Sequence, residues 1–134
     1  MANALSMGQK DLIVIPMTED SPEVKLDSKN WTIKIFGPSF PEDPVEFYGQ
    51  ILKWLDINQT RFDKIVIEFD YSILSSASNK MVFELFLKFE ELINKGKEIV
   101  VKWYYDSNDE DMFDEGKSFK NSMKVPVELI EKQD

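Results

Sequence analysis

Three hydroxyl side chains and one lysine are concentrated in the segment Leu74–Lys80, which reads Leu-Ser-Ser-Ala-Ser-Asn-Lys. A serine hydroxyl can accept a phosphate group, and it can also cap a helix by accepting a backbone N–H. The first N–H groups of a helix have no intrahelical partners, and the helix dipole adds positive potential there. If a helix begins in this segment, its start suits either a neutral serine cap or a phosphate dianion.

The residues on both sides of this segment predict that a helix does begin there. Ile65–Tyr71 is rich in β-branched and aromatic residues, which predicts a strand. Apolar residues then recur at helical spacing from Met81 to Ile93, which predicts an amphipathic helix over Asn79–Asn94. From the residues alone, helix capping is the simpler role for the serines, because serine is a common N-cap.

Two groups of carboxylates offer other chemistry. Glu68 and Asp70 are two residues apart on the predicted strand, so both side chains point to the same face. Six acids lie between Asp106 and Glu115, in an order that superficially resembles a calcium-binding loop. That likeness fails, because an EF-hand needs glycine at its sixth position, where this chain has Asp111. An acid-rich first turn of a helix, favoured by the helix dipole, explains the cluster better.

The composition excludes most familiar catalytic centres. The chain has no cysteine and no histidine, which removes thiolate chemistry, the commonest general base and the commonest neutral metal ligand. Its 16 basic and 25 acidic residues give a net charge of −9, which argues against binding to nucleic acid or to an anionic membrane. We therefore expect protein partners, no cofactor or metal, and no enzymatic activity.

The same reasoning bounds the domain organisation and the location. A chain of 134 residues with 43% hydrophobic content can bury one core. Residues 1–10 lack the apolar core of a signal peptide, and no apolar run approaches the roughly 18 residues of a membrane span. We expect a flexible tail over residues 1–10, a single domain over residues 11–134, and a cytoplasmic location.

The remaining elements follow from periodicity and turn residues. Glu23–Leu26 and Trp31–Phe36 flank a turn-forming segment and predict a β-hairpin, whereas Leu12–Ile15 predicts either an edge strand or an extended arm. Three prolines predict an irregular chain over residues 37–44. The order β-β-α-β-α-β-α-β predicts an α/β layer sandwich, with a mixed sheet and helices mostly on one face. Its other elements are helices at Pro44–Ile57 and Asp109–Phe119 and strands at Glu98–Tyr105 and Val125–Ile130.

Four segments in this order, Thr18–Pro22, Phe40–Tyr48, Leu74–Lys80 and Trp103–Gly116, resemble those of the bacterial SiaC-type regulatory phosphoproteins. The likeness covers nearly the whole chain from about residue 12. That family consists of small single-domain proteins related in fold to the STAS domains of anti-sigma-factor antagonists. The resemblance therefore implies a STAS-like domain.

The resemblance also implies a phosphorylation switch. In the family, a Ser/Thr protein kinase phosphorylates a hydroxyl at the start of the central helix, and a PP2C-type phosphatase removes the phosphate. The unphosphorylated form binds and activates a diguanylate cyclase, which connects the switch to cyclic-di-GMP signalling and biofilm formation. The kinase, the phosphatase and the cyclase are thus the partners that the resemblance implies.

The family pattern assigns the acceptor in this chain. Its junction reads Asn-Thr-Ser-Ser, followed one residue later by Lys. Counted back from Lys80, the phosphorylated threonine falls on Ser76 and the asparagine on Ser75. Ser76 keeps a hydroxyl and is the expected acceptor, with Ser75 as a competing acceptor. The expected surroundings of the phosphate and of the partner are Ser75, Ser78, Asn79 and Lys80.

Two alternatives stay open at this stage. A small acidic metal-dependent hydrolase would use Glu68, Asp70 and the acids near Asp106, and metal should then stabilise it against heat. A constitutive adaptor without a phospho-switch would use the serines as caps alone. In that protein, Ser76→Ala would cost about 1 kcal/mol of stability and leave partner binding unchanged.

Overall fold

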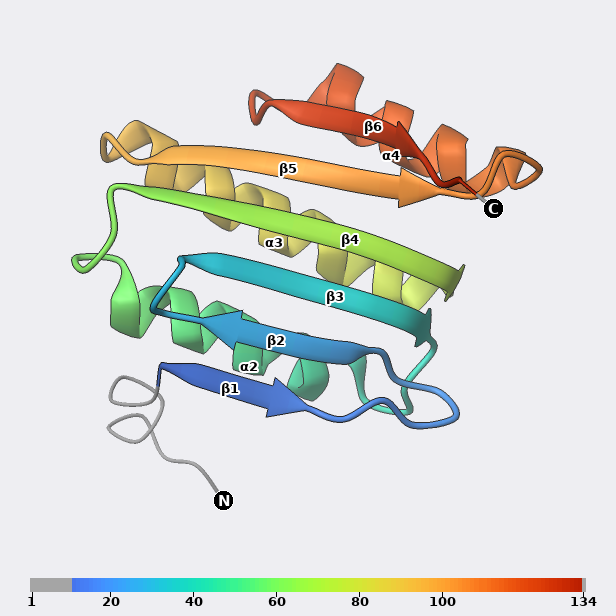
Figure 1. Cartoon of the computed structure of the whole chain (residues 1–134), viewed down its shortest axis with the longest axis horizontal. Coiled ribbons are helices and arrows are strands. Elements are labelled where there is room, and N and C mark those ends of the chain that lie inside the picture. Colours follow the sequence, from blue (N-terminus) through green and yellow to red (C-terminus); the bar gives the residue numbers. More distant parts are fainter. Residues whose placement is uncertain (1–10, 134) are drawn as a thin grey trace.

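A single six-stranded sheet forms the centre of the computed structural model, which describes residues 11–133 (Figure 1). The strands lie in the order β1-β2-β3-β4-β5-β6, so each strand pairs with its neighbours in the sequence. The elements are β1 (Leu12–Ile15), β2 (Glu23–Asp27), β3 (Thr32–Ser39), α2 (Pro44–Asn58), β4 (Lys64–Leu74), α3 (Ser76–Asn94), β5 (Glu98–Tyr105), α4 (Glu110–Ser122) and β6 (Val127–Glu131).

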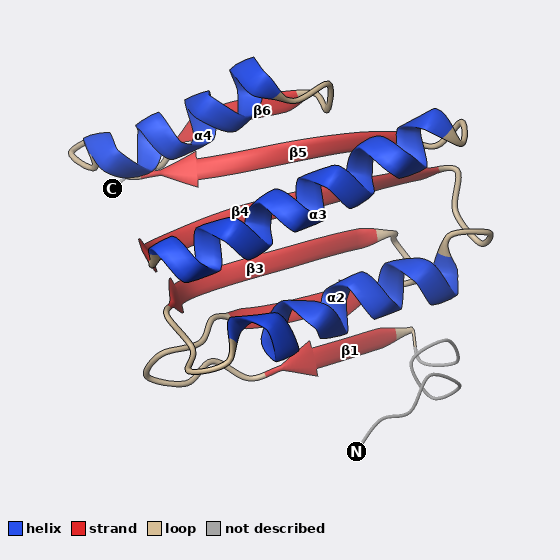
Figure 2. Cartoon of the chain, turned by 180° about the vertical axis from the view of Figure 1, so that it is seen from behind, coloured by secondary structure: helices blue, strands red, loops and turns tan. Residues whose placement is uncertain are grey.

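The sheet is mixed, and the helices lie on one of its faces. β1, β2 and β3 pair antiparallel, whereas β3, β4, β5 and β6 pair parallel. Each parallel pair requires a crossover, and α2, α3 and α4 supply the three crossovers on the same face (Figure 2). The predicted α/β sandwich and element order are confirmed, and Leu12–Ile15 is an additional edge strand. The tail predicted over residues 1–10 lies outside the described residues.

The hydrophobic core lies between the sheet and the three helices. Alternate residues of β4 point into it and are fully or almost fully buried, from Ile65 to Tyr71. The large side chains of Trp54 on α2, Phe86 on α3 and Trp103 on β5 are fully buried as well. The opposite face of the sheet carries no helix among the described residues (Figure 1). Charged side chains, among them Lys34, Glu68 and Asp70, lie on that face.

Three boundaries differ from the predicted ones near the serine segment. β4 continues to Leu74, three residues beyond the predicted end at Tyr71. β3 continues through Ser39, so the irregular chain predicted over residues 37–44 begins later than expected. A register shift between Gly37 and Pro38 accommodates the proline, which cannot donate to a regular ladder. α3 begins at Ser76, three residues before the predicted start at Asn79. The apolar pattern missed this first turn because its buried residue, Ser78, is polar.

No helix among residues 11–133 combines the length and the apolar character needed to cross a bilayer.

Candidate functional site

The serine segment forms the N-terminus of α3, and its two adjacent serines have different environments. Ser75 is the N-cap: its Oγ accepts from the backbone N–H of Ser78 at 3.1 Å, and its own N–H donates to the Ser39 carbonyl at 3.0 Å. Ser76 is the first helical residue and is exposed. Its hydroxyl makes no hydrogen bond within residues 11–133. A modifying enzyme can therefore reach Ser76 more readily than Ser75.

Ser78 is fully buried and belongs to a chain of four hydroxyl groups beneath the helix start. Ser39 Oγ donates to Ser78 Oγ at 2.9 Å and lies 2.6 Å from Tyr48 OH, which lies 2.8 Å from Tyr71 OH. Because the single hydroxyl hydrogen of Ser39 is directed at Ser78, Tyr48 donates to Ser39 and Tyr71 donates to Tyr48. We call these four residues the hydroxyl chain.

The hydroxyl chain joins four elements at the carboxyl ends of β3 and β4. Tyr48 comes from α2, Tyr71 from β4, Ser39 from the end of β3 and Ser78 from α3. Burial raises the pKa of Tyr48 and raises that of Tyr71 well above its usual value, so both phenols stay protonated near neutral pH. Buried hydroxyls that are hydrogen-bonded in this way fix the arrangement of the elements that carry them. Ser78 is thus an interior residue.

Asn79 and Lys80, the two other predicted residues, lie on the outer side of the first turns of α3. The Asn79 Nδ2 donates to Glu115 Oε2 on α4. The sequence did not indicate this hydrogen bond. Lys80 is exposed and makes no ion pair or hydrogen bond with the described part of the chain.

An apolar stripe continues from Ser76 along the outer face of α3. Phe83 and Leu87 are 43% and 40% exposed, although both are large apolar side chains. Together with Ser76 and Lys80 they follow the spacing i, i+4, i+7 and i+11, which places all four on one side of the helix. We call these four residues the α3 stripe. A groove of about 510 Å³ between α3 and α4 adjoins the α3 stripe, and its wall includes Phe83 and Glu115.

The acidic residues near α4 act as the sequence predicted. Asp109 is the N-cap of α4 and accepts from the Met112 N–H at 3.0 Å, while Glu110 and Asp111 lie in the first turn. Four acids, Asp109, Asp111, Asp114 and Glu115, also line a depression next to Leu74, immediately before the serines.

Glu68 and Asp70 do share one face of β4, but this is the face without helices, away from the serines. Glu68 accepts from Tyr104 OH at 2.9 Å, and Lys132 Nζ donates to Asp70 at 3.0 Å. Burial and the hydrogen bond to Glu68 raise the pKa of Tyr104 to about 12, which keeps its proton on the phenol. Within residues 11–133, no group of three or more acidic side chains is placed to hold a metal ion.

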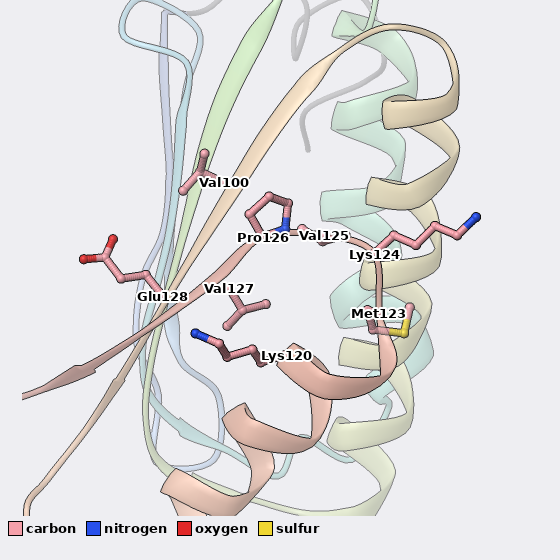
Figure 3. A pocket seen from close by; sticks show the side chains of 8 residues that line it. All are labelled: Val100, Lys120, Met123, Lys124, Val125, Pro126, Val127 and Glu128. Carbon is pink, nitrogen blue, oxygen red and sulfur yellow. The ribbon is translucent and has the colours of Figure 1, made fainter.

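A cavity of about 590 Å³ lies at the opposite end of the sheet, where β5 and β6 begin (Figure 3). Val100, Pro126 and Val127 provide apolar walls, and the Lys120 side chain extends toward Glu128 and Val127 while that of Lys124 points away. The serine segment follows β4 and lies at the carboxyl ends of the parallel strands, where open α/β sheets usually place their functional sites. The cavity in Figure 3 is therefore separate from the candidate site.

Sequence reasoning missed the hydroxyl chain and Glu115. Ser39, Tyr48 and Tyr71 come from three distant segments, and nothing in their spacing joins them. One signal was available: Ser78 lies four residues before Val82, a predicted core position, so it falls on the buried face of an extended helix. A serine at such a position needs a buried polar partner.

Comparison with known proteins connects this chain to one family. The model of the SiaC family regulatory phosphoproteins matches residues 15–132. A curated uncharacterized protein of Pseudomonas aeruginosa strain UCBPP-PA14 is 25% identical over 120 residues, and the match covers 86% of this chain and 92% of that protein.

Solved structures share the fold. A chain in the crystal structure of the Pseudomonas aeruginosa diguanylate cyclase SiaD, in complex with its activator SiaC, superimposes with a TM-score of 0.84 at 21% identity. The match covers 90% of this chain and 99% of that chain. The crystal structure of apo-SiaC from the same organism gives a TM-score of 0.81 at 19% identity, and the match covers 90% of this chain and 99% of that chain.

Proposed function

Because the chain belongs to the SiaC family of regulatory phosphoproteins, we propose that it is a non-enzymatic interaction module controlled by phosphorylation of Ser76. The observation that carries this assignment is the difference between the adjacent serines. Ser76 is exposed, and its hydroxyl makes no hydrogen bond with the described residues, whereas the Ser75 hydroxyl caps α3. A kinase can phosphorylate Ser76 without disrupting the cap.

The partner that we propose is a diguanylate cyclase, which the unphosphorylated protein binds and activates. In support, the similar SiaC of Pseudomonas aeruginosa is the activator of the diguanylate cyclase SiaD. The family resemblance supports a Ser/Thr kinase and a PP2C-type phosphatase as the enzymes that add and remove the phosphate. We propose a cytoplasmic location, because the kinase needs ATP as its phosphate donor.

The α3 stripe is the surface that we propose for the cyclase. Phe83 and Leu87 offer apolar area, and Ser76 lies at the N-terminal end of the same side of the helix. A phosphoserine adds about −1.5 to −2 charges at pH 7. When a partner covers the stripe, that dianion loses its hydration, and binding weakens unless a basic group compensates. This is the physical reason for the unphosphorylated form to be the one that binds.

The first test locates the phosphate. The protein isolated from its native cells is analysed by intact mass and fragment-level site localisation, before and after phosphatase treatment. We expect a phosphatase-sensitive gain of one phosphate at Ser76. Its absence across growth conditions would instead support a constitutive adaptor in which the serines are only caps.

A matched pair of variants separates the two serines. Ser76→Ala should prevent phosphorylation, keep the cyclase bound and leave the stability unchanged, because the Ser76 hydroxyl makes no hydrogen bond within residues 11–133. Ser75→Ala should keep the phosphorylation but cost about 1 kcal/mol of unfolding free energy through the lost cap. Denaturation curves, phosphate mapping and cyclase affinity measure these effects. Phosphorylation lost in Ser75→Ala and kept in Ser76→Ala would contradict the proposal.

A further inference from the structure

The hydrogen bond between Asn79 and Glu115 lies one helical turn from Ser76. Asn79 and Lys80 follow Ser76 by three and four residues, and side chains at these spacings are neighbours on a helix surface. Side chains also lean toward the N-terminus of their helix, so both lean over the turn that carries Ser76. A phosphate on Ser76 would therefore have the Asn79 amide and the Lys80 ammonium group within reach.

We propose that Glu115 is the residue through which a phosphate on Ser76 changes the surface between α3 and α4. The phosphate takes the Asn79 amide from Glu115 and repels the Glu115 carboxylate, which breaks the contact between the two helices at this end. This inference rests on the proposed phosphorylation of Ser76. Glu115 is a positioning residue in this switch, because it acts through Asn79.

The exchange of partners is favoured by charge. Asn79 now donates to a carboxylate with one negative charge, and a phosphate dianion is a stronger acceptor with three oxygens. Lys80 has no partner within the described residues and is available to pair with the phosphate. Glu115 gains nothing from the phosphate, because its carboxylate and the phosphate are both negatively charged and repel each other.

Two contacts with Trp103 restrain the backbone of α4 beside Glu115. Gly116, the next residue, packs so closely on Trp103 that an added Cβ would overlap the indole ring. The Trp103 Nε1 also donates to the Met112 carbonyl of α4 at 2.9 Å. The response is therefore confined to the Glu115 side chain, which turns away from Asn79. Glu115 and Asn79 both line the groove of about 510 Å³ between α3 and α4, so the groove changes in shape and charge.

The direct test observes Asn79 in the protein alone. Nitrogen-15 NMR compares the unmodified full chain with a chain that carries phosphoserine at position 76, in the wild type, in Glu115→Gln and in the control Asp114→Asn. Asp114 is exposed on the same turn and makes no hydrogen bond in the described part of the chain, so the control removes one charge without touching Asn79.

In the wild type and in Asp114→Asn, we expect phosphorylation to shift the Asn79 side-chain amide and the backbone amides around Glu115. In Glu115→Gln, we expect the amides of α4 to stay where they are, because a glutamine can accept from Asn79 and donate to the phosphate. An Asn79 side-chain amide that phosphorylation leaves unshifted in the wild type would overturn the inference. Equal shifts of the α4 amides in all three proteins would overturn it as well.

Affinity for the diguanylate cyclase gives a second readout. Phosphorylation should weaken cyclase binding in the wild type and in Asp114→Asn. In Glu115→Gln, the ratio of the unphosphorylated to the phosphorylated affinity should be at least about fivefold smaller than in the wild type. An equal weakening in all three proteins would refute a role for Glu115 while leaving the proposed function intact. If phosphorylation leaves cyclase binding of the wild type unchanged, the proposed function fails. The shift of the Asn79 side-chain amide on phosphorylation then still tests the inference about Glu115, because it is measured in the protein alone.

Discussion

The two sides of α3 are held by different kinds of contact. Toward α2 and the strands, the hydroxyl chain ties Ser78 to three other elements through buried hydrogen bonds. Toward α4, one hydrogen bond between helical side chains, from the half-buried Asn79 to the exposed Glu115, accompanies an aromatic stack of Phe86 on Phe119 at 4.4 Å. Buried hydroxyls have no water to replace a lost partner, whereas the Asn79 amide can exchange its partner at little cost. The difference teaches that α3 is fixed on one side and adjustable on the other.

The largest expected effect tests whether α4 is held mainly by its close contact with Trp103 rather than by the hydrogen bond between Asn79 and Glu115. Gly116→Val should lower the unfolding free energy by about 2–3 kcal/mol, because its side chain must displace the fully buried Trp103. The control is Gly49→Ala on α2, where an added Cβ meets nothing within 4 Å. That change should be neutral or stabilise the protein by up to about 1 kcal/mol. Urea denaturation measures both, and equal midpoints would show that α4 does not depend on close contact with Trp103.

A middle-sized effect tests the fixed side. Tyr48→Phe leaves the hydroxyls of Ser39 and Tyr71 without their shared partner, so we expect a loss of about 1–2 kcal/mol of unfolding free energy. Tyr105→Phe serves as the control, since the half-buried Tyr105 hydroxyl has no hydrogen bond among residues 11–133. The unfolding free energy of Tyr105→Phe should differ from that of the wild type by no more than about 0.5 kcal/mol. Similar losses in the two variants would mean that the hydroxyl chain contributes no more than an ordinary phenol.

The smallest effect is absent at neutral pH and tests the hydroxyl-chain side of α3 by titration. The pKa values of Tyr48 and Tyr71 are raised by burial, so the unfolded chain ionises first, near pH 10. The folded state then holds protons that the unfolded state has lost, and stability falls as the pH rises above about 10. The unfolding free energy of Tyr48→Phe should fall less steeply there than that of the wild type.

Tyr104, on the face of the sheet without helices, serves as an internal control for this titration. The pKa of Tyr104 is raised to about 12 by burial and by Glu68, so it adds the same slope to both proteins between pH 10 and 12. The difference between the two curves therefore reports the hydroxyl chain. Identical slopes in the wild type and in Tyr48→Phe would exclude its contribution.

The sequence predicted the elements well where apolar residues define them. β4 and α3 are recognisable from Ile67 and Phe89 and their neighbours because each buried position in these stretches is apolar. The prediction was wrong at the start of α3, where Ser78 takes a core position as a hydroxyl. It was also wrong at the end of β3, where a bulge lets Pro38 remain in the strand.

The candidate site was also predictable only in part. The position of the serines at a helix start could be predicted because a strand, a hydroxyl cluster and a helix adjoin each other in the sequence. The choice of Ser76 as acceptor came from the family resemblance and stays a prediction. Glu115 was not found, because it was read as one of several acids near a helix start, and its contact with Asn79 spans 36 positions of the chain. Such contacts depend on how the helices pack, which neither periodicity nor composition encodes.

The sequential order of the strands has a consequence for how the molecule is made. Each strand from β2 onward pairs with the strand before it, so a chain emerging from the ribosome can add strands to one growing edge. The part that ends with α3 can therefore assemble while α4 and β6 are still being synthesised. Ser76 and its cap are complete at that stage, whereas Glu115 arrives later. A kinase acting on the nascent chain would meet the acceptor before the carboxylate is beside it.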